Sequence, residues 1–417
     1  MAVLRAFRAY RPAEGFADKV AALPYDVMNS DEARKAAFGN PYSFLHVDKA
    51  EIDLPKTVDI YDEKVYLKAK ENLGKLISAD VLRQDETPCL YIYMQTWQGR
   101  TQTGLVGCTA VDDYQNAVIK KHEFTRADKE ADRIRHVDTL DANTGPIFLT
   151  YRGTPSVTAV LDDWKASHAP VYDFTANEVR QTVWVVDDTA AVEKLIALFG
   201  KIPSLYIADG HHRAASAVKV AEKRRAAHPD YDGTEEFNFF LSVLFPAEEL
   251  RILDYNRLLL DLNGLNEEEL LARLQQADFT VDKAAQAPFA PTEKHTFGLY
   301  LGGEWYTLKA NPETVDESDP VRRLDVSILQ ERVIAPIFGI DDPRTDKRID
   351  FIGGIRGLSE LERRVDSGEG KAAFAMFPTS PAELMAIADA GLVMPPKSTW
   401  FEPKLLSGLF IHFLSAC

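Results

Sequence analysis

The chain has 417 residues, 46% of them hydrophobic and 27% charged, with a formal net charge of -16 at pH 7. A chain of this length is expected to form two or three domains, and its mean hydropathy of -0.22 excludes a disordered or membrane-embedded protein. The excess of acidic residues repels extended nucleic acid, whereas a small anionic ligand requires only a local group of donors.

The N-terminus and the cysteines indicate a cytoplasmic protein. The segment Met1-Ala-Val-Leu-Arg is too short in apolar length for a secretion signal, and no apolar run approaches the roughly 18 residues of a membrane span. The three cysteines, Cys89, Cys108 and Cys417, include no CxxC pair, so we expect neither a disulfide framework nor a cysteine zinc site. Cys89 and Cys108 lie in strand-like runs and are expected in the core.

The first stretch with possible ligand groups lies near residue 25. Residues 20–23 indicate a strand that ends at Pro24. The loop that follows carries Tyr25 and Asp26, which either form an ordinary turn or contact a substrate.

The next residues predict scaffold elements. Asn29 and Glu32 have the spacing of a capping box at the start of a helix. Residues 57–79 have the apolar spacing of an amphipathic helix, and residues 89–111 read as a β-hairpin that turns at Gln98-Gly99.

A second polar stretch begins with His122 and Glu123, which a short strand delivers into a loop. A polar helix is expected from about residue 126 to 140, and it carries Arg133. Glu123 therefore lies close to a helix start and to several basic residues. The pair is not the HExxH zinc signature, because position 126 is Arg126.

Residues 156–200 alternate between helix and strand patterns, and residues 237–246 form a continuous apolar run typical of a central strand. Asn256 and Arg257 follow on another strand-like stretch, where the arginine is either an edge residue or an anion contact. Helices and a hairpin at Gly302-Gly303 are expected in the remaining chain.

The most distinctive stretch joins a short buried strand at residues 205–208 to a helix at 213–225. A strand that turns through a glycine into a helix start offers free backbone N–H groups and the positive end of the helix dipole. Two histidines and an arginine add charge-assisted donors, so the joint suits a phosphate or a carboxylate. The alternative without a ligand is that Asp209 caps the helix and that the histidines have only structural roles. The residues of the joint are Asp209, Gly210, His211, His212 and Arg213.

A last polar stretch lies near the C-terminus, in a loop bounded by prolines. Two lysines, hydroxyl groups and an aromatic ring suit contact with a phosphate or a nucleotide. The alternative is an ordered loop with solvated lysines. The candidate contacts are Lys397, Ser398, Thr399 and Lys404.

These motifs resemble a bacterial family labelled as domain of unknown function 1015, and the likeness runs essentially from end to end. That label supplies no activity. The matching segments are Leu23-Pro-Tyr-Asp-Val, Asn40-Pro-Tyr-Ser-Phe-Leu, His122-Glu123, Asp209-Gly-His-His-Arg and Met394-Pro-Pro-Lys-Ser-Thr-Trp-Phe-Glu-Pro-Lys.

A narrower likeness points to the ParB/sulfiredoxin fold. A His-Glu after a strand, a later Pro146-Ile147 strand and an Asp-Gly-His-His-Arg turn resemble the free-serine kinases of that fold, which use ADP or ATP. The likeness implies that Glu123 is the general base and that the joint holds phosphates and Mg²⁺, with Asp209 as metal ligand. The two motifs lie further apart here than in those kinases, 86 positions from Glu123 to Asp209.

The expected fold class is α/β (α+β), with a ParB/sulfiredoxin-like core at 111–260 between N-terminal (1–110) and C-terminal (261–417) α/β regions. The expected function is a small-molecule kinase that acts on free L-serine or a similar hydroxyl compound. The alternatives are a nucleotide-binding regulatory module of ParB type and a phosphoester hydrolase. We expect a nucleotide and a small-molecule substrate as partners, neither nucleic acid nor membrane, with homo-oligomerisation left open. The candidate site residues are Glu123 and Asp209 for catalysis; Gly210, His211, His212, Arg213, Lys397, Ser398, Thr399 and Lys404 for phosphate or nucleotide; and His122, Arg133, Tyr25, Asp26, Asn256 and Arg257 for the substrate.

Overall fold

The computed structural model describes residues 1–415 and divides them into two compact units. The first unit contains Met1–Leu250 together with the residues from Pro403 onward, and the second contains Arg251–Glu402. The three regions expected from the sequence do not coincide with these units. The expected boundary after residue 110 runs through one sheet, because the hairpin before it pairs with a strand beyond it.

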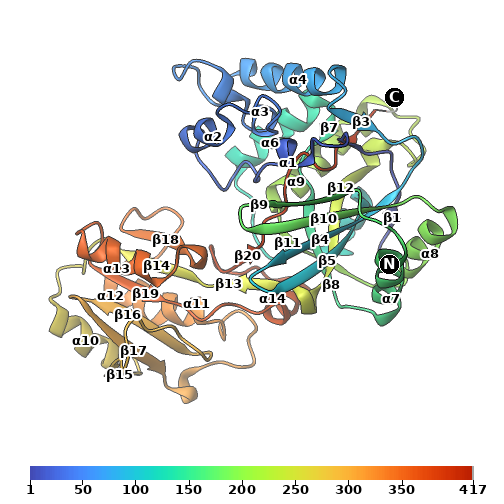
Figure 1. Ribbon diagram of the computed structural model, residues 1–417. Coiled ribbons are helices and arrows are strands. Elements are labelled where there is room, and N and C mark those ends of the chain that lie inside the picture. The colour runs from blue at the N-terminus through green and yellow to red at the C-terminus, as the bar shows by residue number, and fades with distance from the viewer. Residues whose placement is uncertain (416–417) are drawn as a thin grey trace. The chain divides into compact units, whose positions relative to one another are not determined.

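The first unit is built on a nine-stranded mixed sheet (Figure 1). The apolar run expected as a central strand is β12, which is parallel to β8 and antiparallel to β5. The expected hairpin is also present as β4 and β5. In sheet order the strands are β6 (Ile119–Lys120), β11 (Leu205–Asp209), β8 (Ile147–Tyr151), β12 (Phe239–Pro246), β5 (Arg100–Ala110), β4 (Leu90–Trp97), β10 (Val179–Val186) and β9 (Tyr172–Ala176), with β1 (Leu4–Arg5) on β5.

Three helices bury one face of this sheet. They are α7 (Pro155–Ser167), α8 (Thr189–Phe199) and α9 (His211–Ala227). Their apolar residues form one core with alternate residues of the strands, such as Ile147, Leu149 and Tyr151 on β8. This alternation follows from the period of two along a strand. Cys89 and Cys108 are buried in the same unit, as expected, whereas Cys417 lies outside the described residues.

A cluster of helices lies in the chain between β1 and the other strands of this sheet and has its own core, which includes Val20, Phe44 and Leu73. The capping box at Asn29 is confirmed, with both of its hydrogen bonds present. The expected strand at 20–23 is wrong: Val20 ends a short helix, and only Ala22 makes an isolated bridge, to Ser407. The helices are α1 (Ala17–Val20), α2 (Ser30–Ala37), α3 (Leu45–Asp48) and α4 (Glu63–Ser78).

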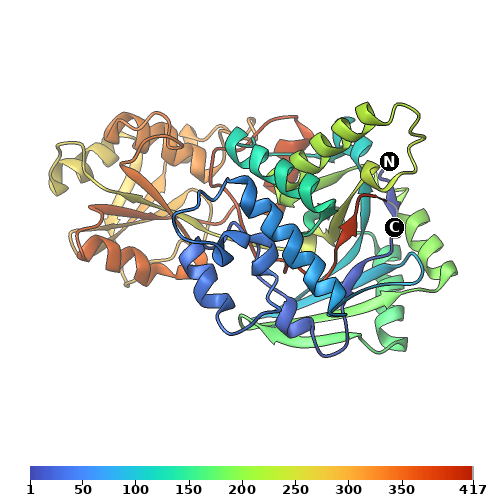
Figure 2. The ribbon, with the colours of Figure 1, turned by 90° about the horizontal axis from the view of Figure 1, so that it is seen from above.

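Helix α6 (Ala127–Leu140) connects this cluster to the sheet, because it packs against both α4 and α9. Figures 1 and 2 show α6 and α9 side by side in both views. The first unit also contains α5 (Val111–Gln115), β2 (Tyr10–Pro12), β3 (Leu82–Gln84), β7 (Ala142–Asn143), β21 (His412–Phe413) and short 3-10 helices.

The second unit has a six-stranded sheet, which includes the expected hairpin at Gly302-Gly303. Its helices are α10 (Glu267–Gln276), α11 (Asp325–Leu329), α12 (Ala335–Phe338), α13 (Leu358–Asp366) and α14 (Pro381–Asp389). In sheet order its strands are β15 (Phe279–Lys283), β17 (Glu304–Ala310), β16 (Thr296–Leu301), β19 (Ala372–Ala375), β14 (Tyr255–Leu259) and β18 (Ile349–Gly353), and β13 (Arg251–Leu253) pairs separately with β20 (Trp400–Glu402).

The two units together make a mixed α+β protein, as the sequence indicates. Among residues 1–415, no helix combines the length and the apolar composition that crossing a bilayer requires.

Candidate functional site

The joint between β11 and α9 forms the centre of the candidate site. Gly210 stands at the N-cap with φ 93° and ψ 31°, in the left-handed region that favours glycine. The helix begins at His211, two residues earlier than the sequence indicates. His211, His212 and Arg213 therefore occupy the first helical turn, where backbone N–H groups have no partner within the helix.

Glu123 reaches this joint because of the strand order. β6 and β11 are parallel neighbours, with Leu205 opposite Ile119. Parallel strands end at the same edge of a sheet, so the loop after β6 leaves the sheet beside the joint after β11. A Glu123 carboxylate oxygen lies 3.9 Å from Nδ1 of His211, and its side chain is 44% exposed, which makes it accessible to a ligand.

A second contact ties the same loop to the joint. The backbone N–H of Arg126 donates to Nε2 of His212 at 3.0 Å. This bond requires that Nε2 of His212 carries no proton. Burial lowers the pKa of His212, which favours that neutral state.

His122 and His211 form a buried pair beneath Glu123. Their ring centroids are 4.5 Å apart and the rings are perpendicular. Burial lowers the pKa of His122 to about 4, although the charge of Asp209 opposes the shift. Burial also holds the pKa of His211 well below its ordinary value, with His122 as the next cause. Both rings are therefore neutral at pH 7.

Asp209 lies between two cations. Its carboxylate accepts a hydrogen bond from Arg213 at 3.3 Å, and Nζ of Lys404 lies 3.7 Å from its other oxygen. Burial by itself would raise the pKa of Asp209, but Lys404 and Arg213 outweigh it and lower that pKa. The carboxylate is therefore ionised. Gln95 donates to the Lys404 carbonyl at 2.9 Å and so holds the lysine in place.

A cavity of about 30 Å³ opens beside Arg213. Arg213 donates to the Pro146 carbonyl at 2.5 Å, and the guanidinium of Arg133 lies 4.1 Å from the centre of the Tyr25 ring. The structure thus brings three of the expected site residues to one cavity. Its lining consists of Pro24, Tyr25, Asp48, Arg133, His136, Val137, Asn143, Thr144, Gly145, Ile147, Arg213, Leu241 and Ser407.

Three connected polar residues of this lining escaped the sequence prediction. Asp48 accepts from the Thr144 hydroxyl at 2.8 Å, and Nε2 of His136 lies 3.7 Å from the same Asp48 oxygen. His136 follows Arg133 by three positions, so both lie on one face of α6. The spacing of three between Arg133 and His136 could have identified His136 as a site residue, but the other polar residues of the helix show similar spacings.

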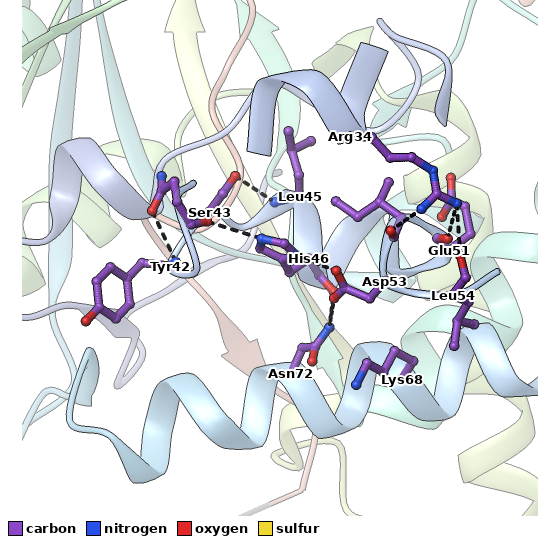
Figure 3. A network of polar contacts seen from close by, with 12 residues as sticks. Arg34, Tyr42, Ser43, Leu45, His46, Glu51, Asp53, Leu54, Lys68 and Asn72 are labelled. Carbon is purple, nitrogen blue, oxygen red and sulfur yellow. Dashed lines mark hydrogen bonds and ion pairs between the residues drawn. The ribbon is translucent and has the colours of Figure 1, made fainter. Parts of the chain in front are cut away.

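A polar network surrounds α3, the short helix that ends at Asp48 (Figure 3). The His46 ring contacts an Asp53 oxygen at 2.8 Å and the Asn40 carbonyl at 3.1 Å. Asn72 donates to Asp53 and to the His46 carbonyl. This network fixes the segment after Asn40-Pro-Tyr-Ser-Phe-Leu, and α3 ends at Asp48.

Asp26 is exposed, next to Tyr25, and lies near the joint. Its negative charge raises the pKa of His212, against the larger and opposite effect of burial. The same charge contributes to a raised pKa of Tyr25, for which burial is the larger cause. Asp26 therefore acts on the site through its charge.

The other expected residues belong to the second unit. Asn256 and Arg257 are buried on β14, so Arg257 is not a solvated edge residue. Burial lowers the pKa of Arg257 to about 10. These contacts are internal to that unit: Asn256 accepts from the backbone N–H of Met376 at 2.8 Å, and Arg257 lies over the Phe351 ring.

The expected loop at 394–404 contains a strand, β20, rather than loop throughout. Lys397 is exposed with its Nζ 5.5 Å from the centre of the Tyr255 ring. The Ser398 hydroxyl donates to the Pro395 carbonyl at 2.6 Å, and Thr399 is half-buried. Of the four candidates in this stretch, Lys404 alone belongs to the first unit and contacts the joint.

The joint therefore combines donors, an ionised carboxylate and a second carboxylate within reach of a ligand. Backbone N–H groups, Arg213 and Lys404 can hold phosphate oxygens. Glu123 can accept a proton from a hydroxyl group that approaches within hydrogen-bond distance.

Comparisons with known proteins give a family without an activity. A family model described as "Protein of unknown function (DUF1015)" matches residues 4–327. No curated protein matches the chain.

Several solved structures are similar over most of the chain. A conserved hypothetical protein from Pyrococcus furiosus is 14% identical, with a TM-score of 0.35, over 74% of this chain and 94% of its own. A free serine kinase in complex with AMP is 14% identical, with a TM-score of 0.36, over 72% and 86%. SbnI with a C-terminal truncation, from Staphylococcus aureus, is 13% identical, with a TM-score of 0.38, over 72% and 85%. At these identities and TM-scores the similarities carry no argument about activity.

Proposed function

Because the chain belongs to the family described as "Protein of unknown function (DUF1015)", whose description names no activity, we propose its function from the site itself. The protein is a small-molecule kinase that transfers a phosphoryl group from ATP or ADP to a hydroxyl acceptor, with free L-serine as the first acceptor to test. Its core is of the ParB/sulfiredoxin type, with the first unit carrying the reaction.

One observation carries this proposal: a half-exposed carboxylate, Glu123, lies 3.9 Å from His211, the first residue of helix α9. Phosphoryl transfer asks for donors around the transferring group and a residue that positions the hydroxyl nucleophile. The joint supplies the donors, and Glu123 is the positioning base.

The proposed reaction is an in-line displacement. The acceptor oxygen forms a bond to the terminal phosphorus while the bond from that phosphorus to the bridging oxygen breaks, which releases ADP from ATP or AMP from ADP. Glu123 accepts the proton that the hydroxyl loses. Arg213, Lys404 and the free N–H groups of the first turn stabilise the charge on the phosphoryl oxygens.

Asp209 is a suitable protein ligand for Mg²⁺. This ion usually binds through one or two carboxylates together with substrate phosphates and water. The lowered pKa of Asp209 keeps its carboxylate ionised at the joint, which fits that requirement. When bound, Mg²⁺ would neutralise charge on the nucleotide phosphates.

The side chains around the small cavity beside Arg213 are the proposed contacts for the acceptor's carboxylate. Arg133 and Tyr25 line it together with Arg213, so a carboxylate on the acceptor would find two guanidinium groups there. His122 acts as a neutral residue beneath Glu123. The mechanism does not require the five other residues for which the sequence predicts ligand contacts. They are Lys397, Ser398, Thr399, Asn256 and Arg257.

Phosphoryl transfer is measured directly by ³¹P NMR. The full chain is incubated with Mg²⁺, ATP or ADP, and a panel of hydroxyl amino acids and polyols. A kinase produces a phosphomonoester signal that depends on the acceptor. Release of inorganic phosphate alone would favour a phosphoester hydrolase, and nucleotide binding without turnover would favour a regulatory module of ParB type. Either of these two results would overturn the kinase proposal.

A further inference from the structure

Three ring nitrogens beside the joint have no hydrogen-bond partner among residues 1–415. They are both ring nitrogens of His122 and Nε2 of His211. A weak backbone hydrogen bond with Ile207 raises the pKa of His122 slightly against the effect of burial, but it does not have the geometry of a normal hydrogen bond. His122 is 1% exposed and His211 6%. Buried polar groups are normally paired, so three such atoms in one place require an explanation.

The contact between the two rings does not provide that explanation. The rings pack edge to face with their centroids 4.5 Å apart. This packing gives the rings van der Waals contact but gives these nitrogens no hydrogen-bond partner. A hydrophobic pair would pack equally well without burying polar atoms. The nitrogens therefore indicate a ligand rather than a core contact.

A carboxylate completes the group. One possible metal-ligand atom from each of His122, Glu123 and His211 can be chosen so that all three atoms lie within 4.8 Å of one another. Two ligand atoms of one tetrahedral zinc ion lie roughly 3.3 Å apart, from metal–ligand distances near 2.0–2.1 Å. The group must therefore contract by about 1.5 Å at most. Glu123 can supply this movement, because it lies on a loop and its side chain is 44% exposed.

We propose that His122, His211 and Glu123 bind a divalent transition-metal ion of the Zn²⁺ class. Two imidazole nitrogens and one carboxylate suit such ions, whereas Mg²⁺ and Ca²⁺ prefer oxygen ligands. Three protein ligands leave one position for water or for an oxygen of a bound molecule. This site is separate from the Mg²⁺ ligand Asp209.

The ion would also control the proposed kinase. A carboxylate that binds Zn²⁺ is not free to accept a proton, so Zn²⁺ at this site would inhibit phosphoryl transfer that Mg²⁺ supports. This consequence rests on the proposed function, whereas the binding of the ion does not.

The test uses the full chain after treatment with a chelator, in the absence of nucleotide. Isothermal titration with Zn²⁺ is expected to give one site per chain, and Co²⁺ is expected to give the absorption spectrum of a low-symmetry site with nitrogen ligands. Glu123→Ala and His122→Gln should weaken Zn²⁺ binding by about tenfold or more. His228→Ala, at the far end of the same helix α9, is the matched control and should bind as the wild type does.

Thermal unfolding shows whether each variant is folded, and so separates the loss of Zn²⁺ binding from the loss of structure. Zn²⁺ should raise the melting temperature of the wild type and of His228→Ala, and should raise it less in the two site variants. Equal Zn²⁺ binding by Glu123→Ala and the wild type would overturn the site. Absence of a stoichiometric Zn²⁺ site in the wild type, or equal affinity for Mg²⁺, would overturn it as well. None of these results depends on turnover, so failure of the kinase proposal is recognised separately by ³¹P NMR.

Discussion

The substitution Gly210→Ala tests the joint with a single methyl group. At φ 93° an alanine meets the steric penalty of the left-handed region, about 1–2 kcal/mol. The new Cβ would also lie 3.1 Å from Nε and 3.2 Å from Cζ of Arg213. The guanidinium must therefore move by a few tenths of an ångström, although its contacts with Pro146 and Asp209 hold it.

Gly233→Ala separates these two effects. Gly233 has the same φ of 93°, and nothing lies within 4 Å of the Cβ that an alanine would add. Both variants should lose about 1–2 kcal/mol of unfolding free energy in urea. Only Gly210→Ala should weaken the binding of ADP, by roughly tenfold. This corresponds to about 1.4 kcal/mol, close to the value of one charge-assisted hydrogen bond.

The assay is isothermal titration with ADP and Mg²⁺, next to urea unfolding of the same preparations. If Gly210→Ala bound ADP as tightly as Gly233→Ala does, Arg213 would not be a phosphate contact. If Gly233→Ala also lost affinity, the loss would reflect general destabilisation, and the reasoning about Arg213 would fail.

Three further predictions concern the same unit. The pKa of His122 falls from its ordinary value of 6.5 to about 4 in the folded protein, so between these pH values the unfolded chain binds a proton that the folded chain does not bind. The free energy of unfolding, measured with a chelator present, should therefore decrease by up to about 3 kcal/mol as the pH is lowered from 6.5 to 4. His122→Gln should remove that part of the pH dependence in urea unfolding. Arg133→Met leaves the buried Asp132 without its ion-pair partner and should cost about 3–5 kcal/mol, whereas stability equal to the wild type would show that the pair is dispensable. Lys404→Met should weaken ADP binding by about tenfold, and Lys223→Met, which removes an exposed lysine, should leave it unchanged in the same titration.

Local patterns in the sequence identified most of the elements. The capping box at Asn29, the hairpin at Gln98-Gly99 and the apolar strand expected within 237–246 each depend on residues close together in the chain. The structure contains all three, with the strand at Phe239–Pro246. The strand expected at 20–23 is wrong, because a run of four apolar residues fits a helix end buried in a core as well as a strand.

The arrangement of the site is a different kind of property. The distance between Glu123 and His211 depends on β6 and β11 being parallel neighbours, and nothing within either motif encodes that pairing. The same reason explains why the sequence does not predict the proposed metal site, because His122 and His211 lie 89 positions apart in the chain.

The expected regions differ from the two compact units for a related reason. Strands β4 and β5 form a self-contained hairpin in the sequence, yet β5 is paired with β12 across more than a hundred residues. The C-terminal segment returns to the first unit and brings Lys404 to Asp209. Long-range pairing of this kind has no local signal, so a single sequence does not reveal it.

The measurement that tests the central claim most directly is the turnover of Glu123→Gln with the acceptor that ³¹P NMR identifies. The amide keeps the shape of the side chain and removes its capacity to accept a proton. Nucleotide affinity should remain that of the wild type, and turnover should fall by about 10²-fold or more. Turnover equal to that of the wild type, with nucleotide bound normally, would contradict the assignment of Glu123 as the base of this site.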